Sequence, residues 1–245
     1  MLQGENLVKS YGARVVLRRV SLTVQSAGLS VLIGPSGCGK STLLRALSLL
    51  EPPDAGRISL DSTSLEFPHA RVPRDLRPWP TVTVVFQQHF LWPHLTLRSN
   101  ILLPIRRAHD REERMATLVA AFGLETVLDR YPNEVSLGQR QRAALVRGLA
   151  LRPRYILLDE ITSALDVEQS AKILRFFLDG GARETGLLIV THLLGFARRL
   201  MSLRDGGMVY FMDQGSIVET GSAEILSAPL TSRLRSFLKA EALVT

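Results

Sequence analysis

Hydrophobic and polar positions along the chain follow two periodicities, one that predicts strands and one that predicts helices. Short β-branched runs separated by turn residues predict strands over residues 2–8, 15–17 and 20–24. Residues 28–33 are continuously apolar apart from Ser30, which is typical of a buried parallel strand. Within residues 40–50 the leucines recur at helical spacing, so a glycine-rich loop joins a predicted strand to a predicted helix.

The rest of the chain continues the alternation of strands and helices. Helical periodicity predicts helices over residues 110–122, 138–149, 167–178 and 230–238. Apolar runs predict strands over residues 57–60, 155–158 and 187–190, and a hairpin of residues 208–212 and 216–218. Residues 51–80 are read as loops and small antiparallel strands, with residues 61–80 as a surface connection. The alternation predicts an α/β fold with a mainly parallel core sheet.

Composition narrows the class of protein. The chain has 245 residues, 46% hydrophobic and 22% charged, so it can bury a core and is not disordered. One cysteine excludes a disulfide framework and fits a reducing compartment. No leader is visible, and prolines, glutamines and histidines exclude a membrane span over residues 78–97. The net charge of +7 indicates either that the protein binds an anionic partner or that it has a solvated, arginine-rich surface.

The glycine-rich loop fits the phosphate-binding pattern G-x-x-x-x-G-K-[ST] between a strand and a helix. Small residues let main-chain N–H groups surround phosphate oxygens, and the helix N-terminus adds partial positive charge. Lys40 can reach the β- and γ-phosphates, and the Ser41 hydroxyl can ligate Mg²⁺. The alternative is a purely structural glycine loop. The predicted site comprises Gly34, Pro35, Ser36, Gly37, Cys38, Gly39, Lys40, Ser41 and Thr42.

Two carboxylates follow the apolar run of residues 155–158. Unpaired charge is costly to bury, so Asp159 and Glu160 at a strand end indicate either chemistry or a strand that reaches solvent. Beside a phosphate loop the first interpretation is favoured: Asp159 holds Mg²⁺ through water, and Glu160 acts as base on the attacking water. The histidines at positions 69, 89, 94 and 109 are not spaced like metal ligands.

With these motifs in order, the chain resembles the ATP-binding subunit of an ABC transporter over nearly its whole length. Residues 85–88 resemble the family's Q-loop, with Gln87 as its glutamine. Residues 135–139 (VSLGQ) stand where the signature LSGGQ belongs. Residues 163–166 match the D-loop, His192 the switch histidine, and Tyr11 the aromatic that stacks on adenine. As alternatives, Tyr11 is a surface tyrosine, Gln87 a solvated loop residue and His192 a core histidine.

The resemblance implies a P-loop NTPase fold with a mainly parallel core sheet, an N-terminal antiparallel β subdomain and an inserted α-helical subdomain. We expect the core in residues 1–86 and 152–245 and the helical subdomain in residues 87–151. It implies ATP and Mg²⁺ as cofactors. It also implies that the catalytic residues are Lys40, Gln87, Glu160 and His192. The metal ligands would be Ser41, Gln87 and Asp159. The signature residues Ser136, Gly138 and Gln139 would bind the nucleotide that is held by a second chain.

The resemblance further implies partners. We expect two chains, as a homodimer, to sandwich two ATP molecules and to dock on transmembrane permease subunits at the cytoplasmic face of the membrane. A groove near residues 91–100 is expected to receive a cytoplasmic loop of the permease, and an extracytoplasmic solute-binding protein acts indirectly. No nucleic acid is expected. Residues 86–96, 191–198 and 211–215 look like those of polar amino acid importers.

Three positions depart from the family pattern. Val135 replaces leucine, Leu137 replaces glycine in the signature, and Ile161 replaces proline after the predicted base. If position 137 needs a positive φ, a leucine there costs about 1–2 kcal/mol and slows closure. Three alternatives therefore stay open: a regulatory protein with weak hydrolysis, an export or lipid-handling subunit, and a soluble ABC ATPase acting on nucleic acid or ribosomes.

Overall fold

Two β-sheets organise the chain. The computed structural model describes residues 1–68, 72, 78–162, 167–178, 180–202 and 206–242. Within them, one sheet is four-stranded and antiparallel in the order β2-β1-β4-β5, and the other is six-stranded in the order β10-β9-β3-β8-β7-β6. All pairs of the second sheet are parallel except β9 with β10. The predicted fold class, a P-loop NTPase with these two sheets and a helical part, is confirmed.

The antiparallel sheet is formed by the first half of the core. Its strands are β1 (Leu2–Tyr11), β2 (Arg14–Val24), β4 (Ala55–Leu60) and β5 (Thr63–Phe67). The two strands predicted over residues 15–17 and 20–24 are one strand, interrupted only locally where Arg19 has a φ of 55°. β5 is one of the small antiparallel strands predicted within residues 51–80. Its Leu65 and Phe67 are buried, so the interpretation of residues 61–80 as a surface connection is wrong at its start.

The mainly parallel sheet places the ends of its strands at the site. Its strands are β3 (Leu29–Ile33), β6 (Val82–Val85), β7 (Tyr155–Asp159), β8 (Gly186–Val190), β9 (Met208–Asp213) and β10 (Ser216–Gly221). Every residue of β3, β7 and β8 is buried, as expected for strands covered on both faces. β6 pairs with β7 and was not predicted.

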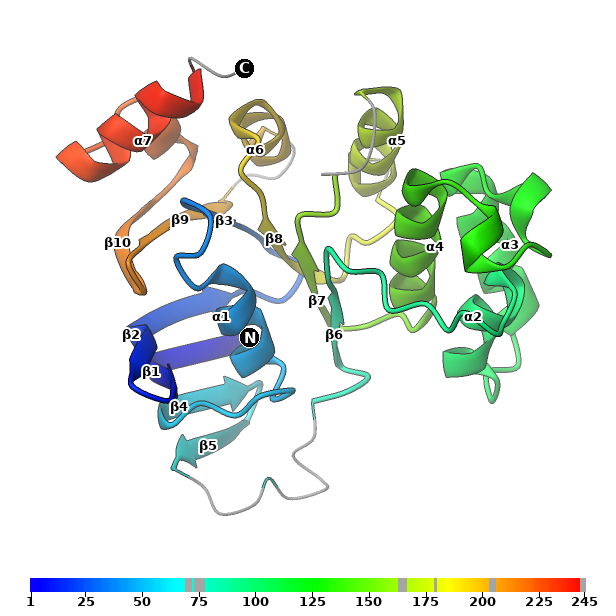
Figure 1. The fold of residues 1–245 in the computed structure, drawn as a ribbon, viewed down its shortest axis with the longest axis horizontal. Helices are drawn as coiled ribbons and strands as arrows, with labels where there is room; N and C mark the ends of the chain where they lie inside the picture. The colour runs from blue at the N-terminus through cyan, green and yellow to red at the C-terminus, as the bar shows by residue number, and fades with distance from the viewer. Residues whose placement is uncertain (69–71, 73–77, 163–166, 179, 203–205, 243–245) are drawn as a thin grey trace.

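The helices lie around the second sheet (Figure 1). They are α1 (Lys40–Leu47), α2 (Leu97–Leu102), α3 (Arg111–Phe122), α4 (Leu137–Ala150), α5 (Val167–Leu178), α6 (Leu194–Met201) and α7 (Ser232–Ala242). α2, α3 and α4 gather on one side of the molecule, beyond β6 and β7. They fall within residues 87–151, although the exact division into subdomains stays a prediction.

Two helix ends differ from the sequence-based prediction. α1 stops at Leu47 rather than at residue 50, because the Ser48 hydroxyl donates to the Leu44 carbonyl and Leu49 takes a φ of 54°. α7 begins at Ser232 rather than at residue 230, since the Thr231 hydroxyl accepts from the Leu234 N–H at the helix start.

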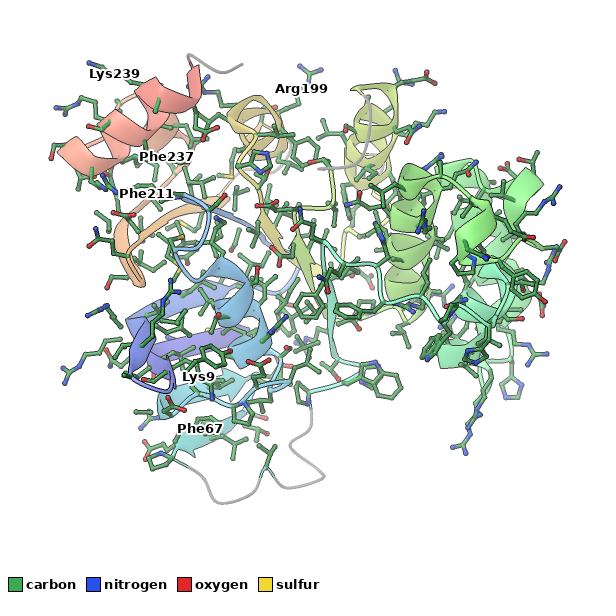
Figure 2. The ribbon with its side chains drawn as sticks, viewed as in Figure 1. Lys9, Phe67, Arg199, Phe211, Phe237 and Lys239 are labelled. Carbon is green, nitrogen blue, oxygen red and sulfur yellow. The ribbon has the colours of Figure 1, made fainter. Side chains whose placement is uncertain are left out.

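Alternate residues of the parallel strands supply two hydrophobic cores. Ile33 and Ile189 face a core built with α2 to α6, whereas Leu32 and Val190 face a core built with α1 and the antiparallel sheet. α7 covers the sheet near β9, where the rings of Phe211 and Phe237 lie 5.3 Å apart (Figure 2). Among the described helices, none is long and apolar enough to cross a lipid bilayer.

Candidate functional site

The predicted phosphate loop joins β3 to α1. Gly34 has a φ of 153°, and a Cβ there would lie 2.1 Å from the main-chain oxygen of Met212, so the loop can pack on β9 only with glycine at this position. Gly37 has a φ of 77° and open space around it. Cys38 is buried, its carbonyl accepts from the Gly215 N–H at 3.1 Å, and burial raises the pKa of its thiol. Its described surroundings are those of a packing residue.

Lys40 holds its ammonium group inside the loop. The side chain is buried, and its Nζ donates to the carbonyls of Gly34 at 2.7 Å and Pro35 at 2.9 Å. Two neutral carbonyls hold the ammonium without neutralising it. The charge is therefore available to an anion that enters the loop.

Asp159 ends β7 beside the phosphate loop. It is only 5% exposed, and burial raises the pKa of its carboxyl group, while a side-chain hydrogen bond from Ser41 opposes this rise. A carboxylate and a hydroxyl next to each other are oxygen ligands of the kind that Mg²⁺ prefers. Among the described residues no cluster of three acidic, histidine or cysteine side chains forms a complete metal cage. A magnesium ion here would complete its shell with substrate oxygens and water.

Glu160 and His192 come together from two neighbouring strands. Glu160 follows β7 with a φ of 49°, and its N–H donates to the carbonyl of Val190 at 3.0 Å. His192 follows β8, and its Nδ1 lies 3.5 Å from a carboxylate oxygen of Glu160. The structure therefore brings the predicted base and the predicted switch histidine within contact distance.

One cleft collects about half of the predicted residues. It has a volume of about 490 Å³ and contains Gln87, Glu160 and the loop residues other than Gly34, Pro35 and Cys38. Its lining comprises Arg14, Val16, Ser36, Gly37, Gly39, Lys40, Ser41, Thr42, Gln87 and Glu160. Sequence reasoning missed Arg14 and Val16 because they lie on β2 and belong to none of the motifs. A basic residue close to Tyr11 was the only available signal.

Tyr11 lies beside this cleft and does not line it. It is 46% exposed at the end of β1, and its hydroxyl donates to Glu51. That hydrogen bond is the main cause of a raised pKa for Tyr11 and a lowered pKa for Glu51. The Tyr11 hydroxyl also lies within hydrogen-bond reach of the Thr42 side chain, so this exposed aromatic residue stands next to the start of α1.

The signature residues form the start of α4, away from the cleft of their own chain. The Ser136 hydroxyl accepts from the Gln139 N–H at 3.2 Å, and the Gln139 side chain accepts from the Ser136 N–H at 2.9 Å. Gly138 is buried in the first turn. None of the three lines the cleft, and residues 163–166 of the predicted D-loop lie outside the described residues.

Leu137 does not meet the condition for backbone strain. It is the first helical residue of α4, it has no positive φ, and its side chain is 52% exposed. The expected cost of a leucine at this position is therefore absent from the described conformation. The side chain instead adds apolar surface beside Ser136.

A groove of about 920 Å³ lies between β6 and α4, behind residues 85–90, which are here called the Q-loop segment. Large apolar side chains are exposed along it: Leu50, Trp79, Phe90, Trp92 and Leu103. Arg147 of α4 borders the groove, donates to the carbonyls of Phe90 at 2.8 Å and His89 at 3.0 Å, and lies over the Trp92 ring. The described lining includes only one residue of the predicted range 91–100, so the groove extends beyond that prediction.

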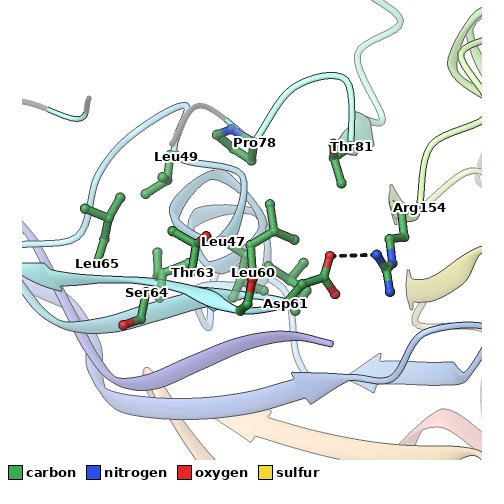
Figure 3. Close-up of a pocket in the computed structure, with 13 residues that line it drawn as sticks. Leu47, Leu49, Leu60, Asp61, Thr63, Ser64, Leu65, Pro78, Thr81 and Arg154 are labelled. Carbon is green, nitrogen blue, oxygen red and sulfur yellow. Dashed lines mark ion pairs between the residues drawn. The ribbon is translucent and has the colours of Figure 1, made fainter. Parts of the chain in front are cut away.

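A further pocket of about 360 Å³ lies between the β4–β5 hairpin and the end of α1 (Figure 3). Leucine side chains form its floor, and the ion pair of Asp61 with Arg154, 3.1 Å apart, lies at its edge. None of the predicted site residues lines it. It is separate from the candidate site.

Comparison with known proteins agrees with this geometry. A family model described as "ABC transporter" matches residues 17–163. The arginine transport ATP-binding protein ArtM of Bacillus subtilis is 38% identical, over 98% of this chain and 99% of that protein. The glutamine transport ATP-binding protein GlnQ of Escherichia coli is 37% identical, with the same coverage.

Two solved structures are also similar. The dimeric bacterial ABC transporter cassette MJ0796 has a TM-score of 0.80 and 27% identity, over 91% of this chain and 99% of that one. A post-hydrolysis dimer of the same cassette, bound to ADP and Pi, has a TM-score of 0.78 and 28% identity, with the same coverage.

Proposed function

Because this chain belongs to the ABC transporter family, we propose that it is the ATP-hydrolysing subunit of an importer for polar amino acids. The observation that carries the proposal is the single cleft that holds the phosphate loop, Gln87 and Glu160 together. ArtM and GlnQ, whose names state arginine and glutamine transport, support the amino acid class.

The loop residues bind the phosphates of ATP. Loop residues between Ser36 and Thr42 line the cleft, where their main-chain N–H groups can bind phosphate oxygens and the N-terminus of α1 adds its partial charge. The Lys40 ammonium exchanges its two carbonyl partners for phosphate oxygens, a stronger charge-assisted interaction. Tyr11, beside the cleft, offers its exposed ring to the adenine base.

The metal site is proposed for Mg²⁺. The Ser41 hydroxyl and the Asp159 carboxylate are adjacent, and Gln87 lines the same cleft, so the available donors are hard oxygen ligands that fit this ion. Bound there, Mg²⁺ neutralises charge on the transferred phosphate. The cation would also balance the negative charge of the Asp159 carboxylate, which is otherwise costly to bury.

Glu160 orients and deprotonates the attacking water. Its carboxylate lines the cleft beyond the phosphate loop, and accepting the water's proton is general-base catalysis. His192, 3.5 Å away, contacts the same carboxylate from β8 and can donate a hydrogen bond to the developing charge on the phosphate.

A second copy of the chain completes each site. Ser136, Gly138 and Gln139 lie outside the cleft of their own chain, which supports a role on the nucleotide of the partner. The dimeric form of the similar cassettes supports the same arrangement. We propose a homodimer that ATP closes and that hydrolysis, followed by phosphate release, opens.

The apolar groove beside Arg147 is proposed to receive a cytoplasmic loop of the permease. Exposed aromatic side chains such as Trp79 and Trp92 are typical of interface anchors. Docking there makes the protein peripheral at the cytoplasmic face of the membrane, next to Gln87. The permease would in turn meet an extracytoplasmic solute-binding protein, and no nucleic acid is needed.

The test is transport by the complex. The tagged chain is isolated from its own membranes together with its permease, reconstituted in vesicles, and supplied with ATP and labelled arginine, glutamine or cystine. We expect uptake that depends on ATP and disappears with Glu160→Gln. Outward transport would favour the export or lipid-handling alternative, and copurified RNA or DNA without a membrane partner would favour the nucleic acid alternative.

A further inference from the structure

One buried side chain links the helix that carries the signature to the main chain of the predicted base. Gln141 lies on α4, is 1% exposed, and donates a hydrogen bond from Nε2 to the carbonyl oxygen of Glu160 at 3.1 Å. α4 lies beside β7, which ends immediately before Glu160 (Figure 1). The contact therefore joins the proposed helical subdomain to the catalytic end of the core sheet.

Glu160 needs such support because its backbone is unusual. Its φ of 49° lies in the left-handed region, which side-chain-bearing residues adopt only when their surroundings impose it. Its N–H is held by the carbonyl of Val190 on β8, and its carbonyl is held by Gln141. With both main-chain polar groups fixed, the carboxylate is aimed at the cleft and at His192.

The other end of the Gln141 side chain argues against a purely structural role. Its Oε1 is buried and accepts no hydrogen bond from the described residues. A buried acceptor without a donor destabilises a fold, and an apolar side chain of the same shape would remove that cost. What the amide supplies that an apolar side chain cannot is the hydrogen bond to Glu160.

We propose that Gln141 is a positioning residue that holds the backbone of Glu160 in its catalytic conformation. The inference rests on the proposed function, in which Ser136 meets the partner's nucleotide. Ser136 and Gln141 belong to one helix and are about 7.5 Å apart along its axis, at about 1.5 Å per residue. α4 therefore carries both the residues proposed to meet the partner's nucleotide and the residue that supports Glu160 of the chain's own site.

The first measurement compares ATP hydrolysis by the dimer with Gln141 and with Gln141→Met, an unbranched apolar replacement. We expect kcat to fall about tenfold, the effect of losing one hydrogen bond in the transition state. KM for ATP is expected to stay within about twofold, and the unfolding temperature to stay equal or rise. Gln141→Leu, which also lacks the donor and carries no charge, is expected to lower kcat as well.

The second measurement places Gln141→Met in a Glu160→Gln background. If Gln141 acts through Glu160, the residual turnover does not fall further. The matched control is Leu145→Met, a buried change one turn along α4 that is expected to leave kcat unchanged.

Two results overturn the proposal. One is wild-type kcat in both Gln141 variants, and the other is the same tenfold loss whether or not Glu160 is present. Failure of the proposed function looks different, since the wild-type protein itself would then hydrolyse no ATP. If Gln141→Met does not fold, Gln141→Leu carries the same comparison.

Discussion

At the scale of single residues, the burial of Asp159 lowers the stability of the fold while it places the carboxylate where the proposed metal site needs it. Its carboxyl group is buried at the end of β7, and burial raises its pKa above the ordinary value of 3.8. The folded chain therefore binds this proton more tightly than the unfolded chain. The contribution to stability is fully present below about pH 3.8 and is lost as the pH rises through the raised pKa.

Asp159→Asn is expected to stabilise the nucleotide-free protein. The amide carries no charge, so at neutral pH the variant avoids the desolvation that the carboxylate suffers. We expect a higher unfolding temperature than wild type above the raised pKa, and no difference at acidic pH, together with loss of Mg-ATP hydrolysis. Thermal unfolding as a function of pH checks this, and an equal or lower stability of the variant at pH 7 would contradict it.

Lys40→Ala is expected to weaken ATP binding by about 10- to 150-fold, the range for a lost hydrogen bond to a charged group. The two carbonyls that hold Nζ in the described structure would be left without their donor. Lys239→Ala is the control, because that exposed lysine lies on α7 (Figure 2). Calorimetric titration measures both, and tight binding by Lys40→Ala would remove the loop from its role.

Residue roles were predictable where a motif is local. The phosphate loop and the pair Asp159–Glu160 are each read from one stretch of chain, and the structure brings them together. Arg14 was not predictable, because it reaches the cleft from the other sheet. The strain suggested for Leu137 depended on a φ that sequence alone does not provide.

At the scale of elements, α4 connects several parts of the molecule. Its first turn carries the signature, Gln141 contacts the end of β7, and Arg147 holds two carbonyls of the Q-loop segment. Burial lowers the pKa of the Arg147 guanidinium, so these carbonyls are partners that the charge needs. The position of the Q-loop segment thus depends on α4.

Arg147→Met is expected to lower the free energy of unfolding by roughly 1–3 kcal/mol, because the carbonyls of His89 and Phe90 lose their charged donor. Arg106→Met is the matched control, since Arg106 is an exposed arginine on the same groove and its change is expected to stay within about 0.5 kcal/mol. Urea unfolding of both variants measures the difference. Equal stabilities would show that Arg147 does not fix the Q-loop segment.

The elements that sequence reasoning found are the long or strongly periodic ones. α3 and α4 follow from apolar spacing, and β3, β7 and β8 from continuous apolar runs. β5 and α2, with five and six residues, are too short for a periodic signal and depend on packing by neighbours. The pairing of β6 with β7 joins segments far apart in sequence, which no local pattern reports.

At the scale of the whole molecule, one chain holds two halves of different sites. The cleft at the phosphate loop lacks the signature residues, and the signature at the start of α4 lacks a phosphate loop. In the proposed dimer each half completes the other. ATP is then the ligand that joins the two chains, and its hydrolysis removes the contact.

The most direct test is the mass of the Glu160→Gln protein in solution, with and without Mg-ATP. The variant keeps the nucleotide bound because the general base is lost, which slows hydrolysis by at least about 100-fold. We predict a monomer without nucleotide and a dimer with it, closed by a signature that contains Leu137. A protein that binds ATP and stays monomeric would contradict closure by two copies of this chain.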